Sequence, residues 1–263
     1  DFINKTPPTG KAVICLDSVN IRKILNKIKN KNIITYGENN KADYQVKNIK
    51  YGIDSTSFNL IFKNKGRKNN YIKKITVKLL GKHNVLNASA AFILCLNLGA
   101  DLNRAKKSLK NFKGVNRRLT LVGSYNAVKL IDDYAHHPTE IENLLSGLKN
   151  AYSKSQITVI FQPHRYSRLI PLIKEFSKSF INSDKVFVSN VYSANEKKPN
   201  DFDLSRVIKL IGKNSNTNCV HLQNLDIVKN EIKKSKSNDV YIFLGAGNIT
   251  EWPYQILKDL NEN

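Results

Sequence analysis

The sequence predicts an α/β protein of two parts, the second being a Rossmann-like domain with a mostly parallel, doubly wound sheet. From about Lys113 onward, short apolar runs alternate with amphipathic segments, which is typical of βαβ units whose strands are buried on both faces. Before that point, polar and apolar residues alternate along several segments, as in half-exposed antiparallel strands. We therefore expect a mixed-sheet part over residues 1–112 and the Rossmann-like domain over residues 113–263.

The first part is expected to begin with strands and to close with helices. Expected strands are residues 11–16, 32–36, 44–46, 57–62 and 72–79, with a polar hairpin loop at 63–70. Expected helices are residues 19–28, 84–98 and 102–112. Gly99 follows the second of these helices, where a glycine commonly terminates a helix.

The second part is expected to alternate strands with helices to the end of the chain. Expected strands are residues 128–131, 157–161, 185–191, 219–222 and 239–244. Expected helices begin at Pro138, a favoured first helical residue, and then cover residues 169–180, 204–211, 227–234 and 252–260.

The strong positive charge is read as a compositional bias and not as a nucleic-acid surface. The chain has 43 Lys+Arg against 21 Asp+Glu, a formal net charge of +22. Lysines far outnumber arginines and are spread along the whole chain, whereas a nucleic-acid interface concentrates its charge on one face or tail. We therefore expect no specific nucleic-acid partner, although the positive potential should attract small anions.

Cysteine content and hydropathy indicate a cytoplasmic location. Three scattered cysteines exclude a disulfide framework and form no metal-ligand pairing, so no metal site is predicted. No apolar run approaches the roughly 20 residues that span a bilayer, so membrane insertion is not expected. The chain contains no methionine and opens on Asp1 in what reads as mid-domain sequence, so we expect a fragment of a longer protein.

Chemically active residues follow four of the predicted strands in the second part. They are carboxylates, imidazoles, guanidiniums and glycines, in residues 132–140, 162–168, 191–196 and 245–248. Because ligands bind beyond the carboxyl ends of parallel strands, this clustering predicts a site for a phosphorylated or carboxylated ligand. Arg165 and Arg168 are suited to grip such oxygens in a bidentate manner.

Each feature alone is also compatible with a structural role. Asp132 and Asp133 suit a turn at a strand end, and Arg165 and Arg168 suit caps on neighbouring elements. Adjacent histidines rarely point the same way, which argues against zinc, and one glycine-rich turn is common among βα connections. Their coincidence at one sheet edge favours a functional site.

Several motifs together resemble the Mur ligase family of peptidoglycan synthesis. Residues 114–118 read GVNRR, residues 132–141 read DDYAHHPTEI, and residues 81–88, GKHNVLNA, are similar to the family's nucleotide-contacting G-x-HN-x-x-N motif. Residues 161–168, FQPHRYSR, look like the version in the member that adds L-alanine. The resemblance extends over nearly the whole chain, from residue 10 to residue 249.

The resemblance implies a UDP-binding domain, a central ATPase domain and a C-terminal Rossmann-like domain. No G-x-x-x-x-G-K-[ST] phosphate loop occurs, because neither Lys11 nor Lys82 has the required glycine spacing and hydroxyl. The expectation is therefore the last part of the ATPase domain over residues 1–112 and the entire C-terminal domain over residues 113–263, inactive on its own.

The implied activity is ATP-dependent amide formation between UDP-N-acetylmuramate and L-alanine through an acyl phosphate. ATP and Mg²⁺ are the implied cofactors, and the metal ligands are expected mainly upstream of this chain. The implied nucleotide contacts are Asn84 and Asn87 on the adenine side, Arg118 near the phosphates and Asp133 at the ribose. Arg118 and His137 are the implied catalytic residues.

The implied contacts to the muramoyl carboxylate and the incoming amino acid are His136, His137, Arg165 and Arg168. The sequence leaves open which of the two histidines acts in catalysis. Two rival interpretations also stay open. One is a murein tripeptide recycling ligase, which shares a similar Asp-x-x-His-His-Pro run, and the other is a basic nucleic-acid-binding module.

Overall fold

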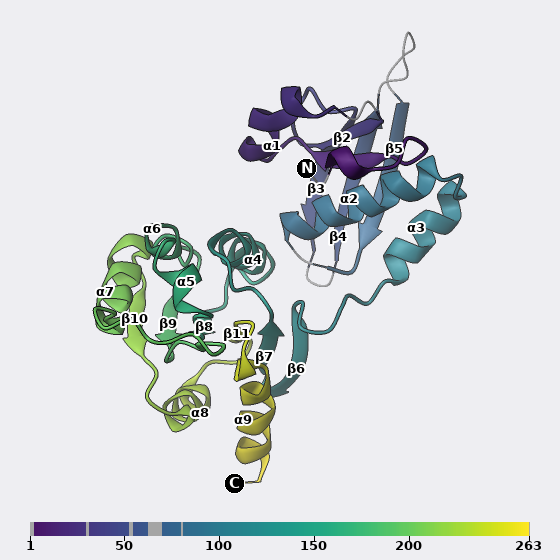
Figure 1. The fold of residues 1–263 in the computed structure, drawn as a ribbon. Coiled ribbons are helices and arrows are strands. Elements are labelled where there is room, and N and C mark those ends of the chain that lie inside the picture. Colours follow the sequence, from purple (N-terminus) through teal and green to yellow (C-terminus); the bar gives the residue numbers. More distant parts are fainter. Residues whose placement is uncertain (1–2, 30–31, 53–54, 63–69, 80, 263) are drawn as a thin grey trace. The chain divides into compact units, whose positions relative to one another are not determined.

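The computed structural model describes residues 3–29, 32–52, 55–62, 70–79 and 81–262 (Figure 1). The chain divides into two compact units, residues 1–114 and 115–263. Each unit has its own sheet and its own hydrophobic core. The predicted division after residue 112 lies two residues before the observed one.

The first unit contains a five-stranded mixed sheet in the order β1-β2-β3-β4-β5. Strands β1, β2 and β3 pair in parallel, whereas β3, β4 and β5 pair antiparallel. The strands are β1 (Ala12–Cys15), β2 (Ile33–Gly37), β3 (Tyr44–Tyr51), β4 (Thr56–Phe62) and β5 (Asn70–Val77). The helices are η1 (Ile3–Lys5), α1 (Val19–Ile24), η2 (Leu25–Lys27), α2 (Lys82–Asn97) and α3 (Leu102–Asn111).

Helix α2 covers the sheet of the first unit and completes its core. Val85, Phe92 and Ile93 of α2 are buried and join a cluster with strand residues such as Phe58 and Leu60. The helix ends at Asn97, and Gly99 then takes a φ of +89°, a conformation that glycine adopts without a Cβ clash.

The second unit contains a six-stranded sheet in the order β10-β9-β8-β11-β7-β6. All neighbours pair in parallel except β6 and β7, which form an antiparallel hairpin. The strands are β6 (Thr120–Tyr125), β7 (Val128–Asp133), β8 (Ile157–Phe161), β9 (Lys185–Val188), β10 (Asn218–His221) and β11 (Val240–Leu244).

Helices cover both faces of this second sheet, which is why its central strands are continuous apolar runs. All five residues of β8 and all five of β11 are buried. One face packs against α4 (Pro138–Ala151), α6 (Ile173–Phe176) and α7 (Leu204–Ser215), and the other against α8 (Leu225–Lys234) and α9 (Trp252–Asn261). The remaining elements are α5 (Tyr166–Leu169) and η3 (Asn248–Glu251).

The predicted fold class is confirmed, with two local differences. The single helix expected over residues 169–180 is two short helices, because Pro171 lies between α5 and α6 and cannot continue the backbone hydrogen bonding. Strand β6 was not predicted. Residues 63–69 of the expected hairpin loop lie outside the described residues. No described helix is long and apolar enough to cross a membrane.

Candidate functional site

Four loops meet at one edge of the second sheet, beyond the carboxyl ends of β7, β8, β9 and β11. Backbone hydrogen bonds tie them together. The Gly245 nitrogen donates to the Asp133 carbonyl oxygen at 3.2 Å, and the Gln162 nitrogen donates to the Leu244 carbonyl oxygen at 2.9 Å. The Tyr192 nitrogen donates to the Pro163 carbonyl oxygen at 2.8 Å. The predicted site residues of this unit therefore project from a connected frame.

Asp133 is 3% exposed, and its carboxylate faces the backbone. One oxygen accepts from the Leu119 nitrogen at 2.8 Å and the other from the Ala135 nitrogen at 2.7 Å. Burial raises the pKa of this carboxyl to about 6, against the lowering effect of the two backbone donors and of Arg118. Asp133 thus fixes the backbone on both sides of the site, and its role at a ribose remains a prediction.

Arg118 lies in the segment that precedes β6. Its side chain is 41% exposed, and a guanidinium nitrogen lies 4.0 Å from a Glu140 carboxylate oxygen. The guanidinium carbon also lies 5.8 Å from the centre of the Tyr134 ring. This long ion pair leaves the guanidinium open to bind an anion.

The adjacent histidines His136 and His137 are held in different tautomers. His136 Nδ1 lies 2.8 Å from the Tyr134 carbonyl oxygen and 3.5 Å from a Glu140 carboxylate oxygen. Both neighbours accept hydrogen bonds, so Nδ1 carries the proton and Nε2 of the neutral ring is a free acceptor. His137 Nδ1 accepts from the Thr139 nitrogen at 3.4 Å, so its neutral ring carries the proton on Nε2.

His164 occupies the centre of the loop after β8 and was not predicted as a site residue. Its ring stacks on Tyr192 with centroids 5.4 Å apart, and lies 6.0 Å from the His136 ring. Arg168 lies 3.2 Å from His164 Nδ1 and, because a guanidinium only donates, makes that nitrogen an acceptor. Burial, and then the nearby Arg168 charge, lower the pKa of His164 below its ordinary value.

Arg165 is exposed, and its charge is close enough to help lower the pKa of His164 and of Glu196. Its backbone has a φ of +68°, and its nitrogen donates to the Tyr192 carbonyl oxygen at 2.9 Å. Within the described residues its guanidinium forms no hydrogen bond or ion pair, and Glu196 is occupied by the Ser167 hydroxyl and nitrogen, at 2.5 and 3.0 Å. The loop is therefore held by its backbone and by Ser167, which leaves the Arg165 guanidinium available to bind an anion.

Asn84 and Asn87 lie in the other unit, on the first turns of α2. Asn84 is 9% exposed, whereas Asn87 is exposed. Lys82 at the start of the same helix forms an ion pair with Glu38, which follows β2. These two asparagines belong to the first unit, and the other six predicted site residues belong to the second.

Two comparisons with protein families cover most of the chain. The family model described as "Mur ligase middle domain" matches residues 1–95. The model described as "Mur ligase, glutamate ligase domain" matches residues 117–247. The chain belongs to the Mur ligase family.

Two curated relatives in this Mur ligase family share one name. A UDP-N-acetylmuramate–L-alanine ligase of Pelagibacter ubique (strain HTCC1062) is 40% identical over 259 residues, which cover 97% of this chain and 55% of the relative. The enzyme of that name from Hydrogenobaculum sp. (strain Y04AAS1) is 38% identical over 257 residues, covering 98% of this chain and 55% of the relative. The chain spans about half the length of the curated relatives it matches.

Solved structures of Mur ligases share this fold. The crystal structure of UDP-N-acetylmuramate-alanine ligase from Thermotoga maritima has a TM-score of 0.68 and 27% identity, covering 87% of this chain and 48% of that one. A MurF ligase from Thermotoga maritima in complex with ADP has a TM-score of 0.71 and 17% identity, covering 99% and 56%.

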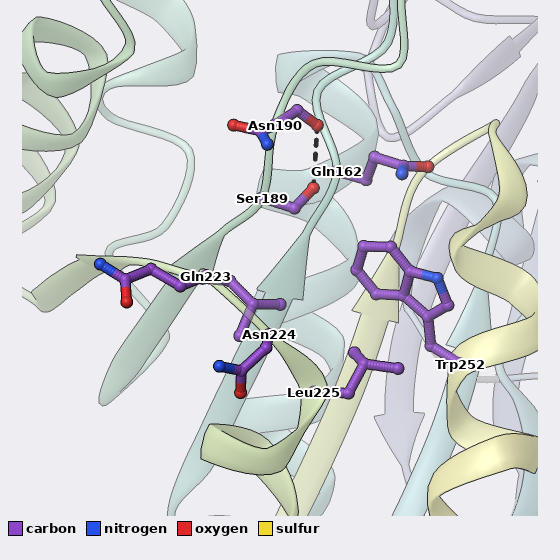
Figure 2. Close-up of a pocket in the computed structure, with 8 residues that line it drawn as sticks. Gln162, Ser189, Asn190, Gln223, Asn224, Leu225 and Trp252 are labelled. Carbon is purple, nitrogen blue, oxygen red and sulfur yellow. Dashed lines mark hydrogen bonds between the residues drawn. The ribbon is translucent and has the colours of Figure 1, made fainter.

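A small cavity of about 250 Å³ opens beside the Mur ligase motifs, between the starts of α8 and α9 (Figure 2). No ionisable side chain is among its lining residues, which are Gln162, Ser189, Asn190, Leu222, Gln223, Asn224, Leu225 and Trp252. Gln162 lines the cavity; its side-chain nitrogen donates to the Asn248 side-chain oxygen at 2.9 Å, and its side-chain oxygen accepts from the Ile249 nitrogen at 3.3 Å. The cavity is thus lined by uncharged side chains, whereas the predicted carboxylate and phosphate contacts are arginines and histidines.

Sequence reasoning missed Glu140, His164 and Tyr192, although it quoted the motifs that contain them. Glu140 lies one helical turn after His136, so an i,i+4 pairing was available as a signal. The stacking of His164 on Tyr192 joins loops 28 residues apart in sequence, and no local pattern encodes it. Within the described ranges no group of three or more His, Cys, Asp or Glu suits a metal ion.

Proposed function

We propose that this chain is part of an ATP-dependent ligase that joins L-alanine to UDP-N-acetylmuramate in peptidoglycan precursor synthesis. The observation that carries the proposal is the 40% identity to a ligase of that name across 97% of the chain. The geometry is compatible with it, because imidazole and guanidinium groups, which can bind carboxylate and phosphate oxygens, gather at one edge of the second sheet.

The proposed reaction begins with attack of the muramoyl carboxylate on the γ-phosphorus of ATP. This step forms an acyl phosphate and releases ADP. The neutral amine of L-alanine then attacks the carbonyl carbon, and the tetrahedral intermediate expels phosphate as the amide forms. Phosphorylation is needed because an oxide ion is a poor leaving group, whereas phosphate is a good one. The protein's contribution is positioning and charge neutralisation.

Arg118 is proposed to neutralise the phosphates in this reaction. Its exposed guanidinium has only a 4.0 Å ion pair with Glu140 to give up on binding. Asn84 and Asn87 are proposed to contact the adenine side. Asp133 is proposed to act at the ribose, where each carboxylate oxygen has a second lone pair beyond its backbone bond. A related fold holds ADP in the MurF ligase.

The histidine tautomers suggest different roles for the two imidazoles. His136 presents a free Nε2, backed at Nδ1 by Glu140, which suits acceptance of the proton that the alanine ammonium group loses before its neutral amine attacks. His137 presents Nε2–H, which suits donation to a developing oxyanion or phosphate oxygen. Arg165 and Arg168 are proposed to bind the substrate carboxylates, with Arg165 as the freer of the two.

Mg²⁺ belongs to the proposal as the companion of ATP. The residues described here offer no cluster of acidic or histidine ligands for it. Its protein ligands are therefore expected outside the described ranges, and the roles above depend only on side chains of this chain.

The test is phosphate release by the full-length gene product containing this chain, given ATP, Mg²⁺, UDP-N-acetylmuramate and one amine donor at a time. We expect release with L-alanine and at least tenfold less with the murein tripeptide. Preference for the tripeptide would instead identify a recycling ligase. No release with either donor, together with tight salt-resistant binding of duplex DNA, would overturn the proposal. The 263-residue chain alone is expected to release no phosphate.

A further inference from the structure

We propose that Arg117, paired with Asp132, is a positioning residue that fixes the glycine turn at residues 245–247 and the backbone from which Arg118 projects. This inference rests on the proposed function. Arg117 and Arg118 are neighbours in one motif, yet the structure assigns them opposite surroundings. Arg118 is the exposed member, whereas the Arg117 side chain is 26% exposed and turned into the unit.

The Arg117 guanidinium joins three segments of the second unit. One nitrogen donates to the Gly245 carbonyl oxygen at 2.8 Å and also contacts the Gly247 carbonyl oxygen at 3.4 Å. Its Nε lies 3.6 Å from an Asp132 carboxylate oxygen at the end of β7. The guanidinium also lies 4.7 Å above the centre of the Tyr134 ring. The Arg117 guanidinium is thus directed at the backbone and the carboxylate that frame the site, in contrast to the exposed guanidinium of Arg118.

Asp132 is the buried anchor of the arrangement. It is 1% exposed, and the oxygen that faces Arg117 also accepts from the Thr250 hydroxyl at 2.7 Å. Its second oxygen and the Arg117 Nε are both buried without a hydrogen-bond partner among the described residues. Removing either side chain would therefore leave an uncompensated charge in a buried place, which couples the two residues strongly.

The Arg117 backbone is fixed as firmly as its side chain. Its φ is +61°, an uncommon conformation for a residue with a Cβ. Its nitrogen donates to the Thr120 hydroxyl at 3.0 Å, and its carbonyl oxygen accepts from the Tyr134 nitrogen at 2.8 Å. On the other side of Arg118, the Leu119 nitrogen bonds Asp133. Arg118 is therefore held between two fixed residues.

The glycine turn at residues 245–247, which Arg117 holds through two carbonyls, also packs against other loops of the site. A Cβ on Gly247 would overlap the Gln162 side-chain oxygen and the Tyr192 ring. The turn is thus packed directly against the loops that follow β8 and β9. A shift of the turn, once Arg117 no longer holds its two carbonyls, would displace those loops as well as Arg118.

The experiment compares Arg117→Ala, Arg117→Lys and the exposed control Arg206→Ala in the full-length gene product. Because a misplacement of 1 Å costs about 10²-fold in rate, kcat of Arg117→Ala should fall about 10²-fold while KM for ATP and L-alanine change less than about threefold. Arg117→Lys should recover part of the rate. Millimolar methylguanidinium should raise kcat of Arg117→Ala at least fivefold and leave Arg206→Ala unchanged.

A double-mutant cycle with Asp132→Asn adds a second readout. The double variant should lose no more rate than the worse single variant, because residues acting as a unit are non-additive. Losses that multiply, or a kcat restored by assay far below the melting temperature, would overturn the proposal in favour of a purely structural role. Absence of alanine ligase activity in the unmutated protein would instead refute the proposed function.

Discussion

The 117–119 segment before β6 and the 162–168 segment after β8 each carry two arginines, and in each segment one is anchored while the other is open. Arg117 is held by glycine carbonyls, and Arg118 is exposed beside a 4.0 Å ion pair. Arg168 is held by His164, whereas the exposed Arg165 guanidinium forms no hydrogen bond or ion pair among the described residues. Each segment thus pairs one anchored arginine with one exposed arginine, but the contacts that anchor the first differ between the segments.

The anchors differ in what they contact, and this difference matters for function. Arg117 binds backbone carbonyls and a buried carboxylate, so it supports the frame of the site. Arg168 binds an imidazole that stacks on Tyr192, so it controls the tautomer of a side chain within the site. Arginine content alone therefore does not identify the residues that bind an anion; the partners of each guanidinium do.

The largest effect should come from the open member of the first segment. Arg118→Met keeps the length of the side chain and removes its charge. If Arg118 neutralises phosphate charge in the transition state, kcat of the full-length enzyme should fall about 10²-fold or more. Steady-state phosphate release measures this, with Arg206→Met as control. An effect below threefold would remove Arg118 from the phosphate site.

In the second segment the open arginine should respond to substitution without loss of stability. Arg165→Lys keeps the charge but loses the bidentate fork. KM for the substrate whose carboxylate Arg165 binds, either UDP-N-acetylmuramate or L-alanine, should rise about tenfold, and KM for ATP should stay constant. The free energy of unfolding should change by less than about 0.5 kcal/mol. Substrate titrations beside a thermal melt test this. A lower melting temperature with both constants raised would mean that Arg165 is structural.

Arg168→Lys is the matched partner of that experiment. Here the melting temperature should fall more than for Arg165→Lys, because the bonds to the His164 ring and carbonyl at 3.2 and 3.4 Å are lost. If the two variants melt alike, the division between anchored and open arginines does not hold in this segment.

Two titratable groups of the site, Asp133 at the end of β7 and His164 in the 162–168 segment, should change stability in opposite directions as pH changes. The pKa of Asp133 is raised to about 6 by burial, so the folded state retains this proton more tightly than the unfolded state. Its contribution to stability therefore falls as pH rises from about 4 to 6, by up to about 3 kcal/mol. The stability difference between the unmutated chain and Asp133→Asn should shrink over that range in chemical denaturation. A difference independent of pH would contradict this.

Asp133→Asn should also weaken nucleotide binding. Loss of a charged hydrogen bond costs about 1.5–3 kcal/mol, so ATP affinity of the full-length enzyme should fall by roughly tenfold or more. Equilibrium binding of ATP at pH 8 measures this. An unchanged affinity would confine Asp133 to its two backbone bonds.

His164 should give the smaller effect of opposite sign. Its pKa is lowered by burial and by Arg168, so the folded state binds this proton more weakly than the unfolded state. Stability from this group is present above its ordinary pKa and is lost as pH falls below it. His164→Gln should therefore lose less stability than the unmutated chain between pH 7 and pH 5, as measured by thermal melts.

Local patterns predicted most strands and helices because apolar runs and helix punctuation are properties of short segments. Strand β6 escaped prediction because Gly123 and Ser124 interrupt its apolar pattern. The two-residue turn to β7 uses Asn126 and Ala127 with φ of +48° and +66°, a conformation that alanine does not signal. The break between α5 and α6 has a local signal in Pro171, but the apolar periodicity continues across the proline and favours a single helix.

The candidate site was predictable as a set of residues but not as a set of contacts. Arg118, His136 and Arg165 were identified from motifs. The placement of His136 and Arg165 at one sheet edge follows from parallel strands, whereas Arg118 reaches that edge through the antiparallel pairing of β6 with β7, in which Thr120 lies opposite Asp132. The opposite roles of Arg117 and Arg118 depend on carbonyls about 130 residues away, at Gly245 and Gly247. A local sequence pattern does not reveal such long-range partners.

The most direct test of the central claim follows oxygen from the muramoyl carboxylate into phosphate. The full-length gene product is given UDP-N-acetylmuramate with both carboxylate oxygens labelled with ¹⁸O, together with ATP and L-alanine, and the released phosphate is analysed by mass spectrometry. An acyl phosphate predicts one labelled oxygen in each phosphate and one in the new amide carbonyl. Unlabelled phosphate accompanying amide formation would contradict the proposed chemistry, and the absence of amide would contradict the proposed function.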